Sequence, residues 1–370
     1  MPIAPDGRPP FRADHIGSLL RPAKLRQAFR DHHERKLSDV EFRRIQDEAI
    51  RDAVKLQEGV GLQVVTDGEF RRGSYWGRFV QLTDGLKVKE ALLHFRDEHG
   101  HETEFTAPYV VGKVKRKQPI TLDEFEFVKP ITKAMPKITL PAPSTMHFYR
   151  FSRYADPGIY ADAAAFFVDL GRVFQEEIAG LAKAGAQYVQ LDETAIAMLC
   201  DPGVRDQVKA GGEDPEALVD LYVDALNAAL KNRPAGMVIG VHLCRGNFKG
   251  KFVAAGGYDS IAEKLFSRAD ANHFLLEYDT PRAGDFAPLR FMPKGKGVVL
   301  GMVSSKTPQL ESMDVLRRRA DEAAKYVDPA RLAISPQCGF ASTVGGNPVT
   351  EADEIAKLRL CVEAAQKIWG

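Results

Sequence analysis

Eight short runs of strand-forming residues alternate with amphipathic stretches along this chain of 370 residues. In the amphipathic stretches, such as residues 162–186, 215–233 and 314–327, apolar side chains recur every three or four positions, which predicts helices. The predicted strands are residues 12–17, 62–69, 137–144, 187–193, 237–244, 273–279, 297–303 and 331–338. Strands that alternate with helices are joined by crossovers and run parallel in one sheet. Eight such units predict a TIM (β/α)8 barrel, with an open doubly wound sheet as the structural alternative.

Two segments do not fit this repeat. Residues 92–133 alternate charged and β-branched side chains with glycine at the bends, which predicts a β-hairpin inserted after the second strand. Such an insertion would serve as a lid or as an oligomer contact, for example in a homodimer. Residues 22–58 predict an extended N-terminal helical region. Since no linker, low-complexity run or internal repeat divides the chain, we expect a single barrel domain over residues 1–370.

The composition is that of an ordinary soluble globular protein, with 44% hydrophobic and 27% charged residues. A net charge of +1 gives no electrostatic reason to expect nucleic acid or an anionic membrane as a partner. No apolar run reaches the roughly 20 residues that span a bilayer, and the first residues lack the apolar core of a signal peptide. We therefore expect a cytoplasmic protein. Its four cysteines favour metal binding or chemistry over a disulfide framework.

Polar or ionisable residues stand at the carboxyl end of each predicted strand. They are His15, Ser18, Asp67, Glu69, Ser144, Asp192, Glu193, His242, Cys244, Glu277, Asp279, Ser304, Ser305, Lys306 and Cys338. Barrel enzymes build their active sites at this face, from the ends of several strands. One polar strand end means little, because turns favour such residues. Eight in succession indicate a single polar site.

Four of these residues form a possible metal-binding set: His242, Cys244, Glu277 and Cys338. His242 and Cys244 are two apart at the end of a strand, so their side chains share one face. Thiolate, imidazole and carboxylate are ligands of Zn²⁺, and two thiolates disfavour Mg²⁺ and Ca²⁺. The alternatives are a hydrogen-bonded histidine and cysteines that simply pack in the core. The spacing alone leaves both interpretations open.

The remaining candidate motifs have simpler explanations. We assign Cys200 and Cys361 to packing, and we expect His94, His99 and His101 to be solvated loop histidines. The glycine pairs lack the residues of a phosphate-binding or dinucleotide-binding loop, and no Gly-x-Ser-x-Gly elbow is present.

Six motifs in this order resemble one known family. They are "DHIGSLLRP", "VVTDGEFRR", "QLDET", "HLCRGNF", "LEYD" and "SPQCGFAS". The combination resembles the catalytic barrel of cobalamin-independent methionine synthase, and more closely its short stand-alone relatives. The similarity extends from about Phe11 to Trp369. It implies an enzyme of methionine biosynthesis that transfers a methyl group to homocysteine or a similar amino-acid thiol.

The resemblance also implies roles for individual residues. It assigns a catalytic zinc to His242, Cys244, Glu277 and Cys338. Zinc would stabilise the substrate thiolate, since a thiol with a pKa near 8.5 is mostly protonated at neutral pH.

The amino-acid part of the substrate would bind on the other side of the site. The resemblance places its carboxylate against Gly17 and Ser18, and its ammonium between Glu69 and Asp192.

The chain departs from the full-length synthase in the part that handles the methyl donor. It has no room for the second barrel, and "PAPSTMHF" lacks the tryptophan on which folate stacks. Lys306 stands where the synthase has a histidine proposed to assist proton transfer, so we assign the catalytic role there to Lys306. The donor remains open among a folate, a corrinoid and another small alkyl donor.

Two other functions are compatible with the same pattern. A zinc-dependent transferase could join a thiol to an epoxide, as the related epoxyalkane–coenzyme M transferases do. The carboxylates of Glu69 and Asp192 argue against that substrate, because they would repel its sulfonate. A barrel with a structural metal and no activity is the other alternative.

Overall fold

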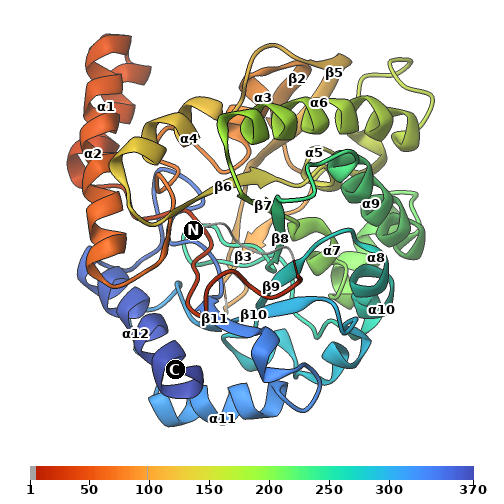
Figure 1. Cartoon of the computed structure of the whole chain (residues 1–370). Coiled ribbons are helices and arrows are strands. Elements are labelled where there is room, and N and C mark those ends of the chain that lie inside the picture. Colours follow the sequence, from red (N-terminus) through yellow and green to blue (C-terminus); the bar gives the residue numbers. More distant parts are fainter. Residues whose placement is uncertain (1–5, 98) are drawn as a thin grey trace.

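A computed structural model describes residues 6–97 and 99–370 and places the predicted strands in a parallel sheet (Figure 1). The sheet has seven strands in the order β1-β6-β7-β8-β9-β10-β11. Their bounds are β1 Val64–Val65, β6 Met135–Pro141, β7 Tyr188–Asp192, β8 Val238–Leu243, β9 His273–Glu277, β10 Gly297–Val303 and β11 Leu332–Pro336. All six neighbouring pairs run parallel, which confirms the predicted α/β class with its helical crossovers.

The predicted first strand, residues 12–17, is not a regular strand. It makes one isolated parallel bridge, Ala13 to Ile334, beside β11. On its other side, the Thr66 hydroxyl donates to the Gly17 carbonyl over 2.6 Å, next to β1. Gly17 has a φ of 130°, so the chain turns away before a longer ladder can form. The segment therefore lies between the two edge strands, an arrangement consistent with a barrel.

Helices surround the sheet in Figure 1. Their bounds are α1 Ala23–His33, α2 Asp39–Gly59, α3 Gly77–Gln81, α4 Leu122–Val128, α5 Thr145–Phe148, α6 Ala163–Ala184, α7 Thr194–Met198, α8 Pro202–Ala210, α9 Pro215–Leu230, α10 Asp259–Arg268, α11 Met313–Ala323 and α12 Glu351–Trp369. The three predicted helices correspond to α6, α9 and α11. The bounds of α6 follow its caps, the Asp162 side chain at the start and Gly185 with a φ of 96° at the end. Among the described residues, no helix is long and apolar enough to cross a bilayer.

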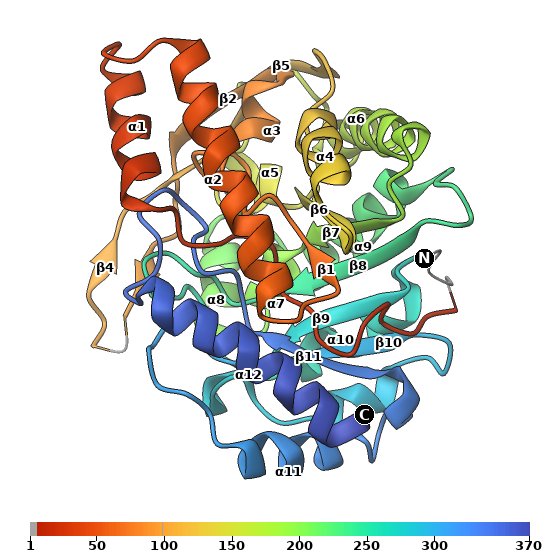
Figure 2. The same ribbon diagram turned by 60° about the vertical axis from the view of Figure 1, so that its left-hand side comes forward.

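The N-terminal helical region consists of two helices rather than one. Residues between α1 and α2 leave the helix, and Ser38 starts α2 with a capping box to Glu41. The two helices pack side by side and extend beyond the sheet (Figure 2).

The insertion between β1 and β6 contains a hairpin, although its bounds differ from those predicted. The long strands β2 (Thr83–Glu90) and β5 (Thr106–Arg116) pair antiparallel, and β3 (Phe95–Arg96) pairs with β4 (Glu102–Thr103) near the tip. The predicted range of 92–133 therefore starts too late. It also ends too late, because α4 follows the hairpin. In "LDEFEFV" the apolar residues Leu122, Phe125 and Val128 are three apart, which is a helical spacing that we missed.

Inside the sheet, beneath the strand ends, lies a buried polar network. The Lys137 ammonium donates to Asp14 Oδ1 over 2.7 Å and to Gln190 Oε1 over 2.9 Å. Gln190 in turn donates from Nε2 to Asp192 Oδ1 over 2.8 Å and to the Ile16 carbonyl over 2.6 Å. A buried charge requires such partners. The network therefore fixes the orientation of Asp192 at the top of β7.

Candidate metal centre

The carboxyl ends of the strands meet around one buried pocket. Its lining residues are Ile16, Ser18, Glu69, Tyr75, Phe95, Tyr149, Asp192, Thr194, His242, Cys244, Gly246, Asn247, Cys338, Gly339 and Ser342. Asp192 and His242 are register partners on the neighbouring strands β7 and β8, so their side chains emerge next to each other. The pocket thus brings together six of the nine residues predicted for the site.

An imidazole and two thiols form a compact cluster in this pocket. One ligand atom each from His242, Cys244 and Cys338 lies within 4.8 Å of the other two, and all three side chains are buried. The two sulfur atoms are 3.8 Å apart. Among residues 6–97 and 99–370, this is the one group of three or more potential metal ligands. The sequence could not decide between ligands and core residues, whereas this convergence favours ligands.

The environment of His242 suits a metal ligand. Its Nδ1 lies 3.2 Å from the Leu275 carbonyl, which can only accept, so Nδ1 carries the proton. Nε2 is buried and has no hydrogen-bond partner in the described part of the chain. A ligating histidine commonly donates its other ring nitrogen to a carbonyl in this way. The lone pair of Nε2 is therefore free to bind a cation.

The two thiols have opposite tendencies to ionise. The contact with Cys244 lowers the pKa of Cys338 well below its ordinary value, although burial opposes this, and His242 and Lys306 lower it further. The same contact with Cys338 raises the pKa of Cys244, as does burial. One proton shared between two sulfurs is the expected result, and a divalent soft cation would replace it. The donor set of one imidazole and two thiolates fits Zn²⁺.

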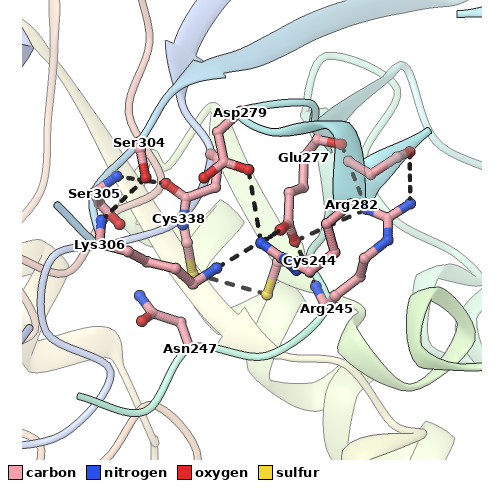
Figure 3. A network of polar contacts seen from close by, with 12 residues as sticks. Cys244, Arg245, Asn247, Glu277, Asp279, Arg282, Ser304, Ser305, Lys306 and Cys338 are labelled. Atoms are coloured by element: carbon pink, nitrogen blue, oxygen red, sulfur yellow. Dashed lines mark hydrogen bonds and ion pairs between the residues drawn. The ribbon is translucent and has the colours of Figure 1, made fainter. Parts of the chain in front are cut away.

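Glu277, the fourth predicted ligand, lies next to this cluster but is not a member of it. Its Oε1 accepts from Arg282 Nη2 over 2.7 Å, and its Oε2 accepts from the Arg245 backbone N–H over 2.6 Å. Lys306 Nζ lies 3.6 Å from Oε1, the same oxygen that Arg282 contacts, and Figure 3 shows both side chains at this carboxylate. Although burial opposes ionisation, the charges of Lys306, Arg282 and Arg245 lower the pKa of Glu277 to about 2. Glu277 is therefore an ionised carboxylate beside the cluster.

Lys306, the predicted catalytic residue, is buried behind Glu277 and does not line the pocket. Its ammonium has no hydrogen-bond partner among the described residues. Glu277 lies at ion-pair distance, and the charge of Lys306 acts on Glu277, Asp279 and the two thiols. A role for Lys306 in proton transfer remains a prediction.

Two carboxylates face the cluster across the pocket. Glu69 has a φ of 60°, a left-handed conformation that costs free energy for a residue other than glycine. The Asp67 side chain accepts from the Glu69 backbone N–H over 2.8 Å and holds this turn. Glu69 Oε1 accepts from the Thr139 hydroxyl over 2.8 Å, while Oε2 is buried without a partner in the described chain. Burial, together with the charge of Glu69, raises the pKa of Asp192 to about 7.

Gly17 and Ser18 lie beside these carboxylates. A Cβ atom on Gly17 would be 2.6 Å from Thr139 Cγ2 and 3.5 Å from Glu69 Oε1, so a side chain would collide with the wall of the pocket. A Cβ atom on Gly339 would lie 2.0 Å from the Ser18 hydroxyl oxygen. Gly17 thus lets the first segment approach Thr139 of β6, and Gly339 lets the loop that follows Cys338 approach Ser18. The predicted carboxylate-binding role of Gly17 and Ser18 stays a prediction.

Aromatic side chains form the remaining wall, and most of them were missed from the sequence. Tyr75 and Tyr149 line the pocket with their hydroxyl oxygens 3.2 Å apart, and Tyr149 also lies 3.2 Å from the Thr194 hydroxyl. Phe95 reaches the pocket from β3 of the inserted hairpin. Nothing local in the sequence marks Phe95 or Tyr149 as neighbours of Cys244.

Several other candidates contribute to the scaffold. Glu193 accepts from Ser144 and from the Ile196 backbone N–H, and thereby caps α7. Cys200 and Cys361 are buried outside the cluster, as expected, and burial raises the pKa of both.

The loop histidines are also outside the cluster. His94 pairs with Glu102 and His101 with Asp97 on the exposed hairpin tip, while the His99 ring lies edge-on to that of His101 with centroids 6.1 Å apart.

Residues 11–367 match the family model described as the catalytic domain of cobalamin-independent synthase. The uncharacterized protein YxjH of Bacillus subtilis (strain 168) is 37% identical over 97% of this chain and 95% of its own. The methionine synthase of Pyrococcus furiosus is 28% identical over 88% of this chain and 85% of its own. A solved structure from Listeria monocytogenes, provisionally named a vitamin-B12 independent methionine synthase, is 30% identical, with a TM-score of 0.76 over 100% of this chain and 99% of that one. A B12-independent methionine synthase from Shewanella sp. W3-18-1, in complex with selenomethionine, has the same fold at 22% identity, with a TM-score of 0.74 over 96% of this chain and 97% of that one.

Proposed function

This chain belongs to the family of the cobalamin-independent synthase catalytic domain, and on that premise we propose that it is a zinc-dependent methyltransferase. Its acceptor is homocysteine or a similar amino-acid thiol, which it binds as the thiolate and methylates to methionine. The resemblance of the sheet to the family's barrel also leads us to infer that residues 12–17 complete an eight-stranded TIM barrel as its first strand.

One observation carries the proposal: a soft-metal cluster and a pair of carboxylates line the same buried pocket. His242, Cys244 and Cys338 would hold the zinc, which leaves at least one coordination position for a substrate. When bound there, zinc lowers the pKa of a coordinated thiol and so supplies the nucleophile at neutral pH. The carboxylates of Glu69 and Asp192 supply the charge that an ammonium group needs on leaving water.

The chain's own residues orient the acceptor. Glu69 and Asp192 bind its ammonium, and Gln190 keeps the Asp192 carboxylate aimed into the pocket through the bond to Oδ1. Gly17 and Ser18 accommodate its carboxylate. With the amino-acid end fixed opposite the cluster, the thiol side chain is directed toward Cys244 and Cys338. Fixing both ends raises the effective concentration of the sulfur at the reaction site.

Glu277 and Lys306 complete the proposed chemistry. Glu277 is an ionised carboxylate next to Cys244, so it is suited to be an exchangeable fourth ligand. Arg282 and Lys306 stabilise its charge when it is not bound to a metal. In this proposal Lys306 keeps the local charge balanced while the number of ligands at the cluster changes.

The decisive experiment measures zinc content and zinc K-edge absorption of the purified chain, with and without homocysteine. We expect one zinc per chain, with an additional sulfur neighbour once homocysteine is added. A zinc whose coordination shell does not change when a thiol is added would favour the non-catalytic metal-binding barrel. Absence of zinc would overturn the proposal.

Cys338→Ser tests the ligand assignment in the same assay. The variant should lose zinc and activity while the chain remains folded, because serine removes one of three clustered donors. Cys361→Ser is the matched control, since Cys361 is buried in α12 away from the cluster. Stoichiometric zinc in Cys338→Ser would refute the assignment.

A further inference from the structure

The hairpin insertion forms the roof of the pocket. Its short strand β3 is joined to the loop after β8 by two backbone hydrogen bonds, from Arg96 N to Phe252 O over 2.7 Å and from Phe252 N to Arg96 O over 2.9 Å. At the base of the tip, Leu92 N donates to the Tyr149 carbonyl over 2.9 Å. The tip of the insertion is therefore attached to the loop that carries Cys244.

Phe95 is the part of this roof that reaches the pocket. A Cβ atom on Gly246 would be only 2.8 Å from Phe95 Cε1, so the ring rests on the backbone two residues after Cys244. The ring is 4.7 Å from that of Phe105 and 5.5 Å from that of Phe248, and Phe105 packs edge-on against Tyr149 at 5.0 Å. An aromatic cluster from the hairpin and the loop after β8 thus covers the thiol cluster.

The charges that line the pocket have one sign. Glu69 and Asp192 are its charged lining residues apart from the metal-binding cluster, and neither lysine nor arginine lines it. Two cations close to the pocket are already engaged: Lys306 with Glu277, and Arg72 with Glu124 over 2.6 Å and with Glu69 over 3.5 Å. Arg72 offsets part of the charge of Glu69, and the amino-acid acceptor brings one ammonium for the two carboxylates. A second, anionic ligand would find no partner, whereas a cation would meet both carboxylates and aromatic rings.

From these features we propose that the methyl donor is a small methylated onium cation, a sulfonium or a quaternary ammonium, held against Tyr75, Tyr149 and Phe95. This inference rests on the proposed thiol methyltransferase function and identifies its second substrate. Onium groups are attracted to the faces of aromatic rings, and most strongly where water is excluded. No lysine or arginine lines the pocket to pair with the glutamate tail of a folate.

The reaction balances without another reactant. The thiolate sulfur forms a bond to the methyl carbon while the bond from that carbon to the onium sulfur or nitrogen breaks. The electron pair of the broken bond remains on the leaving atom, which departs as a neutral thioether or tertiary amine. The proton of the acceptor thiol passes to water when the thiolate forms. Because an anion and a cation become two neutral groups, a pocket of low polarity favours the transfer.

The first test is binding by the full chain, measured by calorimetry with choline and with its neutral isostere 3,3-dimethylbutan-1-ol. We expect choline to bind at least about 10-fold more tightly, and Tyr149→Leu to reduce its affinity about 3- to 30-fold. Tyr149→Phe, which keeps the ring, should lose less. Tyr326→Leu is the matched control, because Tyr326 is an exposed tyrosine that does not line this pocket. Equal binding of choline and its isostere would overturn the inference.

The second test is transfer to homocysteine from trimethylsulfonium, S-methylmethionine or glycine betaine, compared with 5-methyltetrahydrofolate and methylcobalamin. Methionine formed from a sulfonium, an ammonium donor or both supports the inference and identifies the leaving atom. Methionine formed only from the folate or the corrinoid overturns it and leaves the proposed function intact. A zinc edge that responds to homocysteine while no onium donor reacts also overturns it. A zinc K-edge spectrum that does not change on addition of homocysteine refutes the inference and the proposed function together.

Discussion

Arg21 offers a strong test of how the scaffold holds the pocket. Its guanidinium is 2% exposed and donates four hydrogen bonds to backbone carbonyls. Nη2 donates to Glu69 over 2.9 Å and to Arg72 over 2.7 Å, and Nη1 donates to Ala341 over 3.2 Å and to Thr343 over 3.0 Å. One side chain thus joins the turn that carries Glu69 to the loop that follows Cys338.

Arg21→Met keeps much of the side-chain length but leaves four carbonyls without their donor. A hydrogen bond from a charged donor contributes about 1.5–3 kcal/mol, although removing the guanidinium also removes its own desolvation cost. Deleting one partner of a buried charged interaction typically costs about 3–5 kcal/mol, and we expect a loss of that size here. The turn at Glu69 should also loosen, which we expect to weaken homocysteine binding about 10-fold, or about 1.4 kcal/mol.

The assay is urea unfolding together with calorimetric titration of homocysteine into the folded variant. Arg30→Met is the matched control, since Arg30 is exposed on α1, and its free energy of unfolding should stay within about 0.5 kcal/mol of wild type. The reasoning would be refuted if two results were found together. The free energy of unfolding of Arg21→Met would lie within about 1 kcal/mol of wild type, which is the contribution of a single neutral hydrogen bond, and the variant would bind homocysteine normally.

Two further predictions concern single carboxyl groups. Asp192→Asn should weaken homocysteine binding by about 10-fold or more while zinc content stays at the wild-type level, because an amide cannot offset the charge of an ammonium; equal affinity in calorimetry would rule out that role. Burial raises the pKa of Glu354 to about 8 even though its carboxylate accepts from the Leu20 backbone N–H over 2.8 Å. A raised pKa in the folded state stabilises the protein fully below the ordinary value of 4.5, and this contribution is lost as the pH rises toward about 8. Glu354→Gln should therefore flatten the decline in unfolding free energy over that pH range, and parallel curves for variant and wild type would contradict the assignment.

Sequence patterns identified what depends on local spacing. The strands that follow β1 are short apolar runs that end in polar residues, so both their positions and their common polar edge could be predicted. His242 and Cys244 could be paired because residues two apart in a strand share a face. The first segment was less regular than predicted: it makes two backbone hydrogen bonds with Ile334 around a single bridge, and Gly17, with a φ of 130°, then turns the chain.

Contacts between distant segments could not be predicted in this way. Phe95 meets Gly246 only because the hairpin folds across the strand ends. The local sequence of a hairpin does not predict which part of the protein its tip will contact. The cationic surroundings of Glu277 were missed for a related reason. Arg282 and Lys306 belong to loops after two different strands. The sequence alone does not distinguish a loop cation that pairs with a buried carboxylate from one that is solvated.

In the proposed function, the attachment of the hairpin tip would affect how fast substrates and products exchange. Phe95 of β3 lines the pocket, so separation of β3 from the loop after β8 would widen the path by which the proposed acceptor and products exchange. The two backbone hydrogen bonds between Arg96 and Phe252 contribute about 1–3 kcal/mol in all, so breaking them leaves an open state populated to about 1–15%. Loop openings of this kind occur in microseconds to milliseconds, and release of product often limits such enzymes. The overall rate would then be governed by a segment that lies outside the sheet and carries none of the proposed metal ligands.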